Sequence, residues 1–202
     1  MITIINYESG NIGSISSMLR KINISYQITE NVLDIKEANK IILPGVGSYD
    51  SAILRLKEKN LFDIIKNKIF DNDTFVLGIC LGMQLMCKGS EEGKESGFGY
   101  FKKTCKKFDH NNFDTKNTFM GWSNIIQKKK HSILNGISNE NKYYFLHSFY
   151  YPICEYDTYS VSENGGKFSS IIIKNKTIGT QFHPERSHKF GMKILKNFSE
   201  LK

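Results

Sequence analysis

Residues 78–82 read Gly-Ile-Cys-Leu-Gly, between a short apolar run over Thr74–Leu77 and a predicted helix over Met83–Lys88. A reactive side chain with glycine two residues away on each side, between strand and helix, is typical of a nucleophile elbow in an α/β fold. The turn is so tight that a Cβ at either glycine position would clash with the flanking strand or helix. The helix N-terminus behind the sulfur favours a thiolate. The pattern predicts a nucleophilic Cys80, with a buried structural cysteine as the alternative.

The length of 202 residues predicts one domain over residues 1–202, or one domain with a small excursion. Hydrophobic residues make up 40% of the chain, which is enough to bury a core. No apolar run is long enough for a transmembrane helix, and Met1–Asn6 lacks the charged region of a signal peptide, so we expect a cytoplasmic protein. The four cysteines show no Cys-x-x-Cys spacing. We therefore expect reduced thiols, no metal and no cofactor.

The formal net charge of +8 raises the possibility of an acidic ligand. The densest basic runs are Lys102-Lys103, Lys106-Lys107 and Lys128–Lys130, and no aromatic residues are interleaved with them in a nucleic-acid motif. We interpret these runs as solvated faces and expect neither a nucleic acid nor a membrane as partner. An acidic protein surface or a phosphorylated metabolite is the alternative.

Strand and helix patterns alternate in the first half, which predicts βαβ units and a parallel sheet. The expected strands are Ile2–Asn6, Ser25–Thr29, Lys40–Leu43 and Thr74–Ile79, and the expected helices are Ile12–Ile22 and Tyr49–Phe70, the latter broken near Asn60. The second half has short β-type runs instead, over Phe98–Phe108, Lys142–Tyr151, Tyr156–Ser162, Ser169–Ile173 and Thr177–Phe182, before a helix at Lys189–Leu201. We expect the polar segment Asp109–Asn117 to be a mobile loop.

A cysteine nucleophile needs a base and a third group that orients the base. Of the five histidines, His183 has the right surroundings, in Gln181-Phe-His-Pro-Glu185. Pro184 keeps His183 extended, and residues two apart in an extended segment face the same side, so Glu185 can reach the imidazole. With the elbow, this pattern predicts a Cys80-His183-Glu185 triad. On its own it would indicate a strand-end histidine beside an incidental carboxylate.

The reaction of a thiolate with a carbonyl also needs two donors for the oxyanion. The backbone N–H of Leu81, directly after the nucleophile, is one candidate. The second is in Pro44-Gly-Val-Gly47, at a strand end, where the glycines allow the Val46 peptide to turn its N–H toward the substrate. A tight βα turn that needs glycine only for steric reasons is the alternative.

The elbow with Met83-Gln84 and the segment Gln181–Glu185 closely resemble the triad, or class I, glutamine amidotransferases. Further segments are similar to the glutaminase subunits of imidazole glycerol phosphate synthases, and these are Tyr7-Glu-Ser-Gly-Asn11, Leu43-Pro-Gly-Val-Gly47, Met120-Gly-Trp122, Tyr144-Phe-Leu-His-Ser148 and His183-Pro-Glu-Arg-Ser187. The resemblance spans nearly the whole chain. It implies an α/β fold with a central, mostly parallel sheet flanked by helices, and an antiparallel β-rich second half.

The resemblance also implies roles for individual residues. Cys80 attacks the side-chain amide of L-glutamine, with His183 as base and then acid and Glu185 holding His183. The implied oxyanion hole consists of Val46, Gly47 and Leu81, and the implied substrate-binding residues are Gln84, Glu92, His147, Ser148 and Phe149. For Glu92 the physical case is a carboxylate that pairs with the α-ammonium group of the substrate.

Few residues follow Glu185, so we expect the ammonia acceptor in another chain. The resemblance implies a heterodimer with a (β/α)8-barrel cyclase, which uses the ammonia to make imidazole glycerol phosphate and AICAR in histidine biosynthesis. One alternative is the same glutaminase feeding a sugar amidotransferase complex in surface polysaccharide synthesis. Another is a catalytically silent binding module on the same fold.

Overall fold

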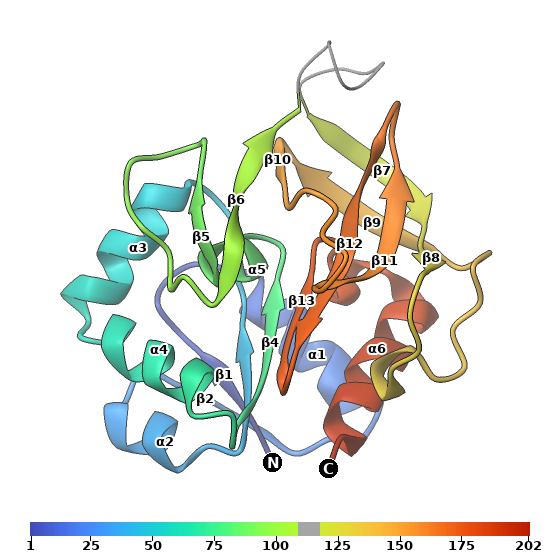
Figure 1. Cartoon of the computed structure of the whole chain (residues 1–202). Helices are drawn as coiled ribbons and strands as arrows, with labels where there is room; N and C mark the ends of the chain where they lie inside the picture. Colours follow the sequence, from blue (N-terminus) through green and yellow to red (C-terminus); the bar gives the residue numbers. More distant parts are fainter. Residues whose placement is uncertain (109–117) are drawn as a thin grey trace.

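The computed structural model describes residues 1–108 and 118–202, and the loop expected over Asp109–Asn117 lies outside them. A large central sheet has helices on both faces, and two smaller sheets stand at one end of the molecule (Figure 1). Within the described ranges, no helix combines the length and the apolar character that crossing a bilayer requires.

The central sheet has eight strands in the order β2-β1-β3-β4-β13-β12-β11-β8. The first five are parallel, namely β2 (Tyr26–Thr29), β1 (Ile2–Ile5), β3 (Lys40–Leu43), β4 (Phe75–Ile79) and β13 (Thr177–Thr180). The last three join antiparallel, namely β12 (Lys167–Lys174), β11 (Thr158–Glu163) and β8 (Ile126–Gln127). The predicted parallel sheet with an antiparallel second half is confirmed.

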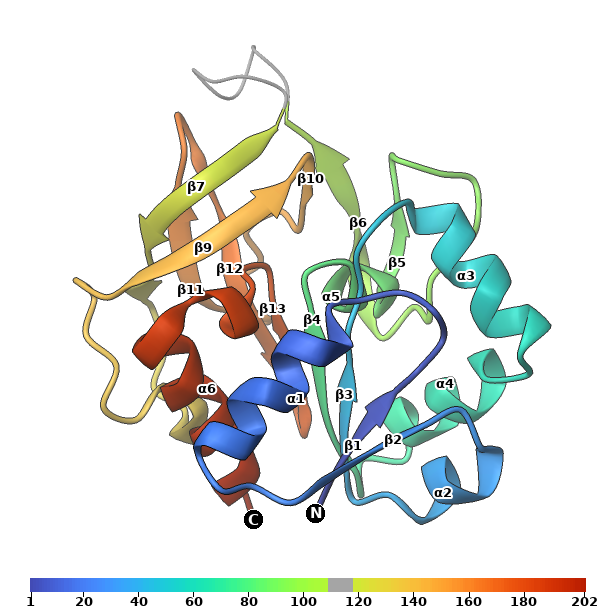
Figure 2. The ribbon, with the colours of Figure 1, turned by 180° about the vertical axis from the view of Figure 1, so that it is seen from behind.

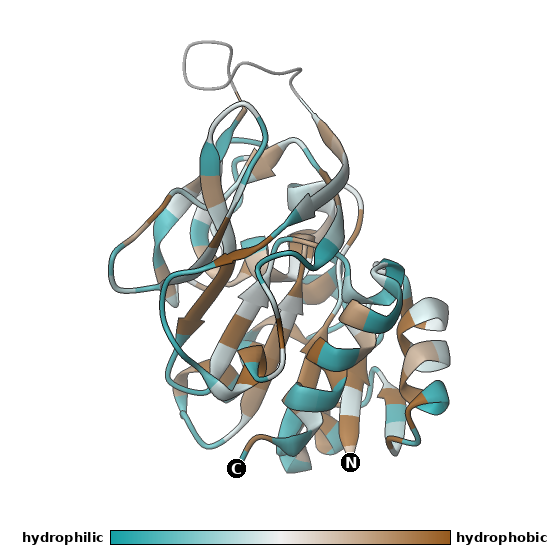
Figure 3. Cartoon of the chain, turned by 90° about the vertical axis from the view of Figure 1, so that its right-hand side faces the viewer, coloured by the Kyte–Doolittle hydropathy of each residue, from teal (hydrophilic) through white to brown (hydrophobic). Residues whose placement is uncertain are grey.

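Side chains alternate between the two faces of the parallel strands, as the period of two requires. Ile42 and Leu77 belong to one hydrophobic core, whereas Ile41 and Val76 belong to the other. The first core lies under α1 (Ile12–Lys21) and α6 (His188–Glu200), and the second under α2 (Val32–Glu37), α3 (Tyr49–Glu58) and α4 (Phe62–Phe70) (Figure 2). Figure 3 shows mainly hydrophobic strands at the centre and alternating hydrophilic and hydrophobic bands along the helices.

Two small sheets flank the carboxyl ends of the parallel strands. One contains β5 (Cys87–Ser90), β6 (Phe101–Lys107) and β10 (Phe149–Tyr150), and the other pairs β7 (Phe119–Asn124) with β9 (Lys142–His147). The remaining elements are α5 (Leu81–Leu85) and the short 3-10 helices η1 (Ser132–Leu134) and η2 (Pro184–Arg186).

Several predicted boundaries differ from the structure, and three of them change an element near the site. The helix expected over Met83–Lys88 is present with other bounds, because α5 covers Leu81–Leu85 and Cys87 already pairs with Phe101 in a parallel ladder. The run expected from Phe98 becomes a strand only at Phe101, since Gly99 has a left-handed backbone, with φ of 74°. The run over Lys142–Tyr151 is divided into β9 and β10 at Ser148.

Candidate active site

Cys80 is the single residue between β4 and α5, and its backbone is strained, with φ of 51° and ψ of −107°. The flanking glycines permit this turn. A Cβ on Gly82 would lie 2.0 Å from the carbonyl oxygen of Leu43, and one on Gly78 would lie 2.5 Å from Cε of Met86. Both positions therefore require glycine, Gly78 because of the elbow's own helix, as expected, and Gly82 because of the neighbouring strand β3, which differs from the expectation.

His183 reaches Cys80 because their strands are neighbours in the parallel sheet. In the register of β4 and β13, Ile79 faces Thr180, and the backbone N–H of Cys80 donates to the carbonyl of Thr180 at 2.7 Å. Nucleophile and base thus follow the carboxyl ends of adjacent strands, where ligands of such sheets bind. The backbone N–H of His183 donates to the carbonyl of Tyr144 in β9 at 2.9 Å, which ties this corner to the second small sheet.

The expected contact between His183 and Glu185 is present, with 2.8 Å between Nδ1 and Oε1. Both side chains are almost completely buried. The backbone differs from the expectation, since only His183 is extended and Pro184 begins the 3-10 helix η2. A proline fits the first position of a helix because its missing N–H has no intrahelical acceptor there.

The charge state of His183 is set by its neighbours. Burial alone would lower the pKa of this imidazole, but the charge of Cys80 and its hydrogen bond, together with the hydrogen bond and charge of Glu185, raise the pKa to about 10. An imidazolium at neutral pH is thereby favoured beside the sulfur. A thiolate–imidazolium pair is the state in which a cysteine is ready for nucleophilic attack.

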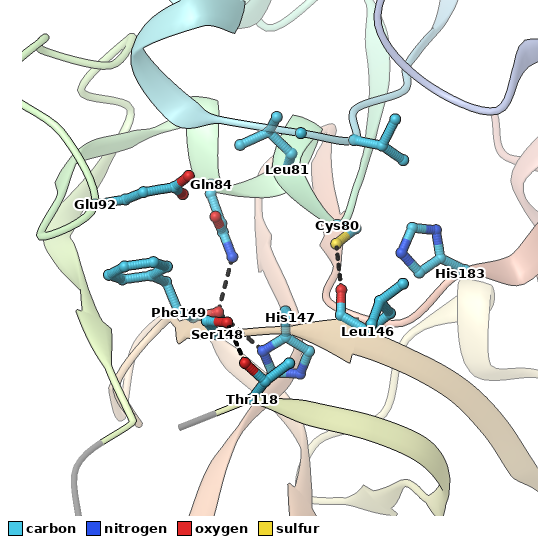
Figure 4. Close-up of a pocket in the computed structure, with 12 residues that line it drawn as sticks. Cys80, Leu81, Gln84, Glu92, Thr118, Leu146, His147, Ser148, Phe149 and His183 are labelled. Carbon is cyan, nitrogen blue, oxygen red and sulfur yellow. Dashed lines mark hydrogen bonds between the residues drawn. The ribbon is translucent and has the colours of Figure 1, made fainter. Parts of the chain in front are cut away.

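Two further groups contact the sulfur of Cys80. The carbonyl oxygen of Leu146 lies 3.6 Å from Sγ (Figure 4). Nε2 of Gln181 donates to Sγ at 3.8 Å. The sequence reasoning gave neither residue a role. For Gln181 the signal was available, since it stands two residues before His183. Leu146 contributes a backbone oxygen, which every residue type has, so its residue type could not indicate this contact.

A pocket of about 250 Å³ opens over Cys80. It collects most of the residues named from the sequence, and its lining includes Val46, Gly47, Cys80, Leu81, Gln84, Glu92, His147, Ser148, Phe149 and His183. Glu185 stands behind His183, as an orienting group should. Thr118 and Leu146 complete the lining and were not predicted. The hydroxyl groups of Thr118 and Ser148 lie 2.7 Å apart in a hydrogen bond (Figure 4).

Gln84 and His147 fix one carbonyl group at the edge of the pocket. The amide Nε2 of Gln84 donates to the carbonyl of Phe149 at 2.8 Å, and Nδ1 of His147 donates to the same oxygen at 2.9 Å. Burial lowers the pKa of His147 to about 3, helped by the nearby charge of His183 and opposed by the bond to Phe149. His147 is therefore neutral, and its N–H holds the backbone carbonyl of Phe149 in place. His183, in contrast, is positively charged at neutral pH.

Glu92 is a solvent-exposed residue in the loop after β5, and its side chain lines the pocket wall. Its Oε1 accepts a hydrogen bond from the backbone N–H of Tyr49 at 3.2 Å. Burial raises the pKa of this carboxyl, the charge of Asp50 adds to the rise, and the bond from Tyr49 opposes it. Among residues 1–108 and 118–202 no cationic side chain forms an ion pair with this carboxylate, and an ammonium group in the pocket would supply the positive charge.

The two expected oxyanion donors differ in their surroundings. Leu81 is the first residue of α5, where a backbone N–H has no intrahelical acceptor. The N–H of Val46, in contrast, donates to the hydroxyl of Ser9 at 3.3 Å, and that hydroxyl donates to the carbonyl of Val46 at 2.7 Å. In this structure the N–H and the carbonyl of Val46 are thus both bonded to Ser9, and the N–H does not have the expected orientation toward the reacting carbonyl of the substrate.

Comparison with known proteins shows the family of the chain. The family described as "Glutamine amidotransferase class-I" matches residues 3–201. "Imidazole glycerol phosphate synthase subunit HisH 2" of Methanococcus maripaludis is 42% identical over 200 residues, covering 98% of each chain. The protein with the same description from Pseudomonas aeruginosa is 38% identical over 202 residues, covering all of both chains.

Solved structures share the fold at low sequence identity. A putative GMP synthase protein from Thermoplasma acidophilum superimposes with a TM-score of 0.73 at 18% identity, over 98% of this chain and 91% of that one. A second structure, described as a glutamine amidotransferase, also has a TM-score of 0.73, at 13% identity, over 99% of this chain and 98% of that one. The fold, the full-length relatives and the elbow agree with one another, and the chain belongs to the class I glutamine amidotransferases, in the family of imidazole glycerol phosphate synthase glutaminase subunits.

Proposed function

We propose that this chain hydrolyses L-glutamine to glutamate and ammonia with Cys80, His183 and Glu185, and passes the ammonia to a synthase subunit. The observation that carries the proposal is the buried arrangement of the three groups below one pocket, with the Nδ1–Oε1 contact of 2.8 Å on the side of His183 away from that pocket. A pocket of about 250 Å³ is large enough for an amino acid of this size.

The reaction follows from the charge states. The Cys80 thiolate attacks the amide carbon of glutamine. The resulting oxyanion accepts a hydrogen bond from the backbone N–H of Leu81. The His183 imidazolium gives its proton to the leaving nitrogen, the C–N bond breaks, and ammonia departs from a glutamyl thioester. Neutral His183 then takes a proton from water, whose oxygen attacks the thioester and releases glutamate and the thiolate. Glu185 stabilises the imidazolium in both halves of the reaction.

Recognition of glutamine rests on the far end of the pocket. The carboxylate of Glu92 lines the pocket there and has the charge to bind the α-ammonium group of the substrate. Gln84 and the backbone of His147, Ser148 and Phe149 supply neutral polar groups for the α-carboxylate side. The second oxyanion donor, Val46, requires its N–H to leave Ser9 and turn to the substrate.

An exposed apolar surface beside the nucleophile fits a partner subunit. Met120, Trp122 and Leu146 are 70%, 44% and 38% exposed. They lie on the paired strands β7 and β9, where Met120 faces Leu146 in the register. Since the carbonyl of Leu146 contacts Sγ of Cys80, this surface borders the point at which ammonia is made. We infer that a (β/α)8-barrel cyclase, which produces imidazole glycerol phosphate and AICAR, covers it.

Labelling with an electrophilic glutamine analogue tests the chemistry. We expect one adduct per chain, on Cys80, found by mass spectrometry of the peptides. The variant Cys80→Ala is the control and should take up no label. Labelling at another cysteine, or unchanged labelling of the variant, would refute the assignment of the nucleophile.

Purification of the chain with its partners from its own cells tests the destination of the ammonia. Recovery of a barrel cyclase that raises glutaminase activity supports the histidine pathway. Recovery of a sugar amidotransferase complex in place of the cyclase would overturn that assignment and leave the glutaminase chemistry intact.

A further inference from the structure

We propose that Gln181 is a positioning residue that stabilises the Cys80 thiolate through a side-chain N–H···S hydrogen bond. The inference rests on the proposed role of Cys80 as the nucleophile. Gln181 is fully buried directly after β13, and its Nε2 is 3.8 Å from the sulfur.

The orientation of the Gln181 amide follows from its neighbours. The carbonyl of Phe149 can only accept, so the group that Gln84 turns toward it must be the donor Nε2. The same Nε2 of Gln84 also donates to Oε1 of Gln181, at 3.4 Å. Since the oxygen of Gln181 is engaged there, its N–H groups face the sulfur. A continuous chain of hydrogen bonds therefore joins Phe149, Gln84, Gln181 and Cys80.

The contacts of the sulfur with Leu146 and with Gln181 suit different protonation states of Cys80. A thiol can donate its proton to the carbonyl of Leu146, which lies 3.6 Å away. When that proton moves to Nε2 of His183, the sulfur becomes an acceptor only. The N–H of Gln181 then stabilises the thiolate, whereas the Leu146 oxygen does not. Because Gln181 and Gln84 are both buried, this bond acts with little screening by water.

The rate of alkylation of Cys80 by iodoacetamide as a function of pH tests the proposal in the intact chain. Gln181→Met removes the donor at similar length, and Gln181→Glu replaces it by an acceptor of similar shape. We expect alkylation at neutral pH to slow about tenfold in the first variant, as loss of a hydrogen bond to a charged group implies, and more in the second. The half-buried Cys154, followed in the same digests, is the internal reference.

The shape of the pH profile separates this role from a structural one. The ionisable groups around the sulfur are His183, Glu185, His147 and Tyr7, and the variants leave all of them in place. We expect the midpoint of the profile to move to higher pH in both variants. Gln27→Met, on β2 in the same sheet, should leave it unchanged.

The outcomes distinguish this proposal from the proposed function. If the glutamine analogue labels Cys80 but the profiles of Gln181→Met and Gln181→Glu match the wild type, the role of Gln181 is refuted and the nucleophile stands. If the analogue does not label Cys80 in the wild type, the proposed function fails first. If Gln181→Met does not fold, as thermal unfolding would reveal, the isosteric Gln181→Glu decides.

Discussion

At the scale of single residues, His183 shows how two neighbours override burial. Burial disfavours the charged imidazole, yet Cys80 and Glu185 together raise its pKa to about 10. A group whose pKa lies that far above 6.5 stays protonated throughout the neutral range. His147, in β9, is equally buried but bonds to the neutral carbonyl of Phe149, so burial lowers its pKa to about 3. The function of each histidine follows from its surroundings.

Removal of the sulfur should reverse the charge state of His183. In Cys80→Ala the strongest group that raises the pKa is gone while the effect of burial remains, so the pKa should fall well below about 10. The imidazole then becomes neutral at a lower pH than in the wild type. NMR titration of the histidine ring signals measures this change, with the exposed His188 as internal reference. A pKa of His183 that stays near 10 would contradict the ion pair.

Glu92 should set the acid limit of substrate binding. Its raised pKa means that the carboxylate loses its charge at a higher pH than an ordinary glutamate, so KM for glutamine should rise as the pH falls through that value. Glu92→Gln should raise KM about tenfold at neutral pH, the scale of a lost charged hydrogen bond, and flatten the acid limb. Steady-state ammonia release over a pH series measures both.

The adjacent Glu91 is the matched control. Its carboxylate already binds the side chain of Lys106 and the backbone of Lys107. Glu91→Gln should therefore leave KM unchanged. An equal effect of the two variants would reject Glu92 as the specific partner of the α-ammonium group.

At the scale of elements, the loop Pro44–Gly47 is held by the segment that follows β1. The hydroxyl of Tyr7 donates to the carbonyl of Pro44 at 2.6 Å, and Ser9 binds both polar groups of Val46. The same loop lies against the elbow, where a Cβ on Gly45 would be 2.5 Å from the N atom of Gly82. The orientation of the Val46 peptide is therefore decided by contacts on the side away from the substrate.

Ser9→Ala should raise the glutaminase activity of the isolated subunit. The substitution removes the acceptor that occupies the Val46 N–H, which becomes available to the oxyanion. A net hydrogen-bond value of about 1 kcal/mol corresponds to about a fivefold gain in kcat. Ammonia release without a partner measures the gain, and Ser199→Ala on α6 is the control. An unchanged or lower kcat would show that Ser9 does not restrain the peptide.

The elements that the sequence predicted well are those with strong local signals. β1, β3 and β4 are short apolar runs between helical patterns, and the break near Asn60 appears as a left-handed residue between α3 and α4. Helix α2 was missed because its six residues span less than two turns and include one buried residue, Ile35. Its beginning is fixed by the Asn31 side chain, which accepts from the N–H of Leu33.

The predictions for the candidate site differ in the same way between contacts with a local sequence signal and contacts without one. The contact of His183 with Glu185 could be predicted because both stand in one short motif. The bonds of the sulfur to Leu146 and Gln181 join residues 66 and 101 positions apart from Cys80. Such contacts depend on the register of β4, β13 and β9 and on a backbone carbonyl, and residue types in a sequence do not specify either.

At the scale of the whole molecule, the site depends on both halves of the fold. The parallel half supplies the elbow at the end of β4, and the second half returns to place β13 beside it. The β7–β9 pair then brings Leu146 over the sulfur and exposes its other face to solvent. Strand β9 therefore contributes both to the exposed face and to the surroundings of the Cys80 sulfur. A partner bound to β7 and β9 would contact the strand that also contacts the nucleophile.

Trp122 should anchor that partner. Its ring is 44% exposed, and it stacks on His188 with centroids 5.3 Å apart and planes 5° apart, so it is held rigid on the surface before binding. A preordered aromatic residue at an interface loses little conformational entropy on association. Trp122→Ala should therefore weaken the complex with the proposed barrel cyclase about 30-fold or more, the effect of losing about 2 kcal/mol.

Calorimetric titration of the two subunits measures this loss. Phe70→Ala is the matched control, because Phe70 is 43% exposed but ends α4, before the amino end of β4 and away from the pocket. The control should bind as the wild type does. Labelling of Cys80 by the glutamine analogue should be equal in all three free proteins, since Trp122 lies outside the pocket lining. Equal affinities for Trp122→Ala and wild type would place the partner on another face, and the ammonia would then have to leave Cys80 by a path that does not cross β7 and β9.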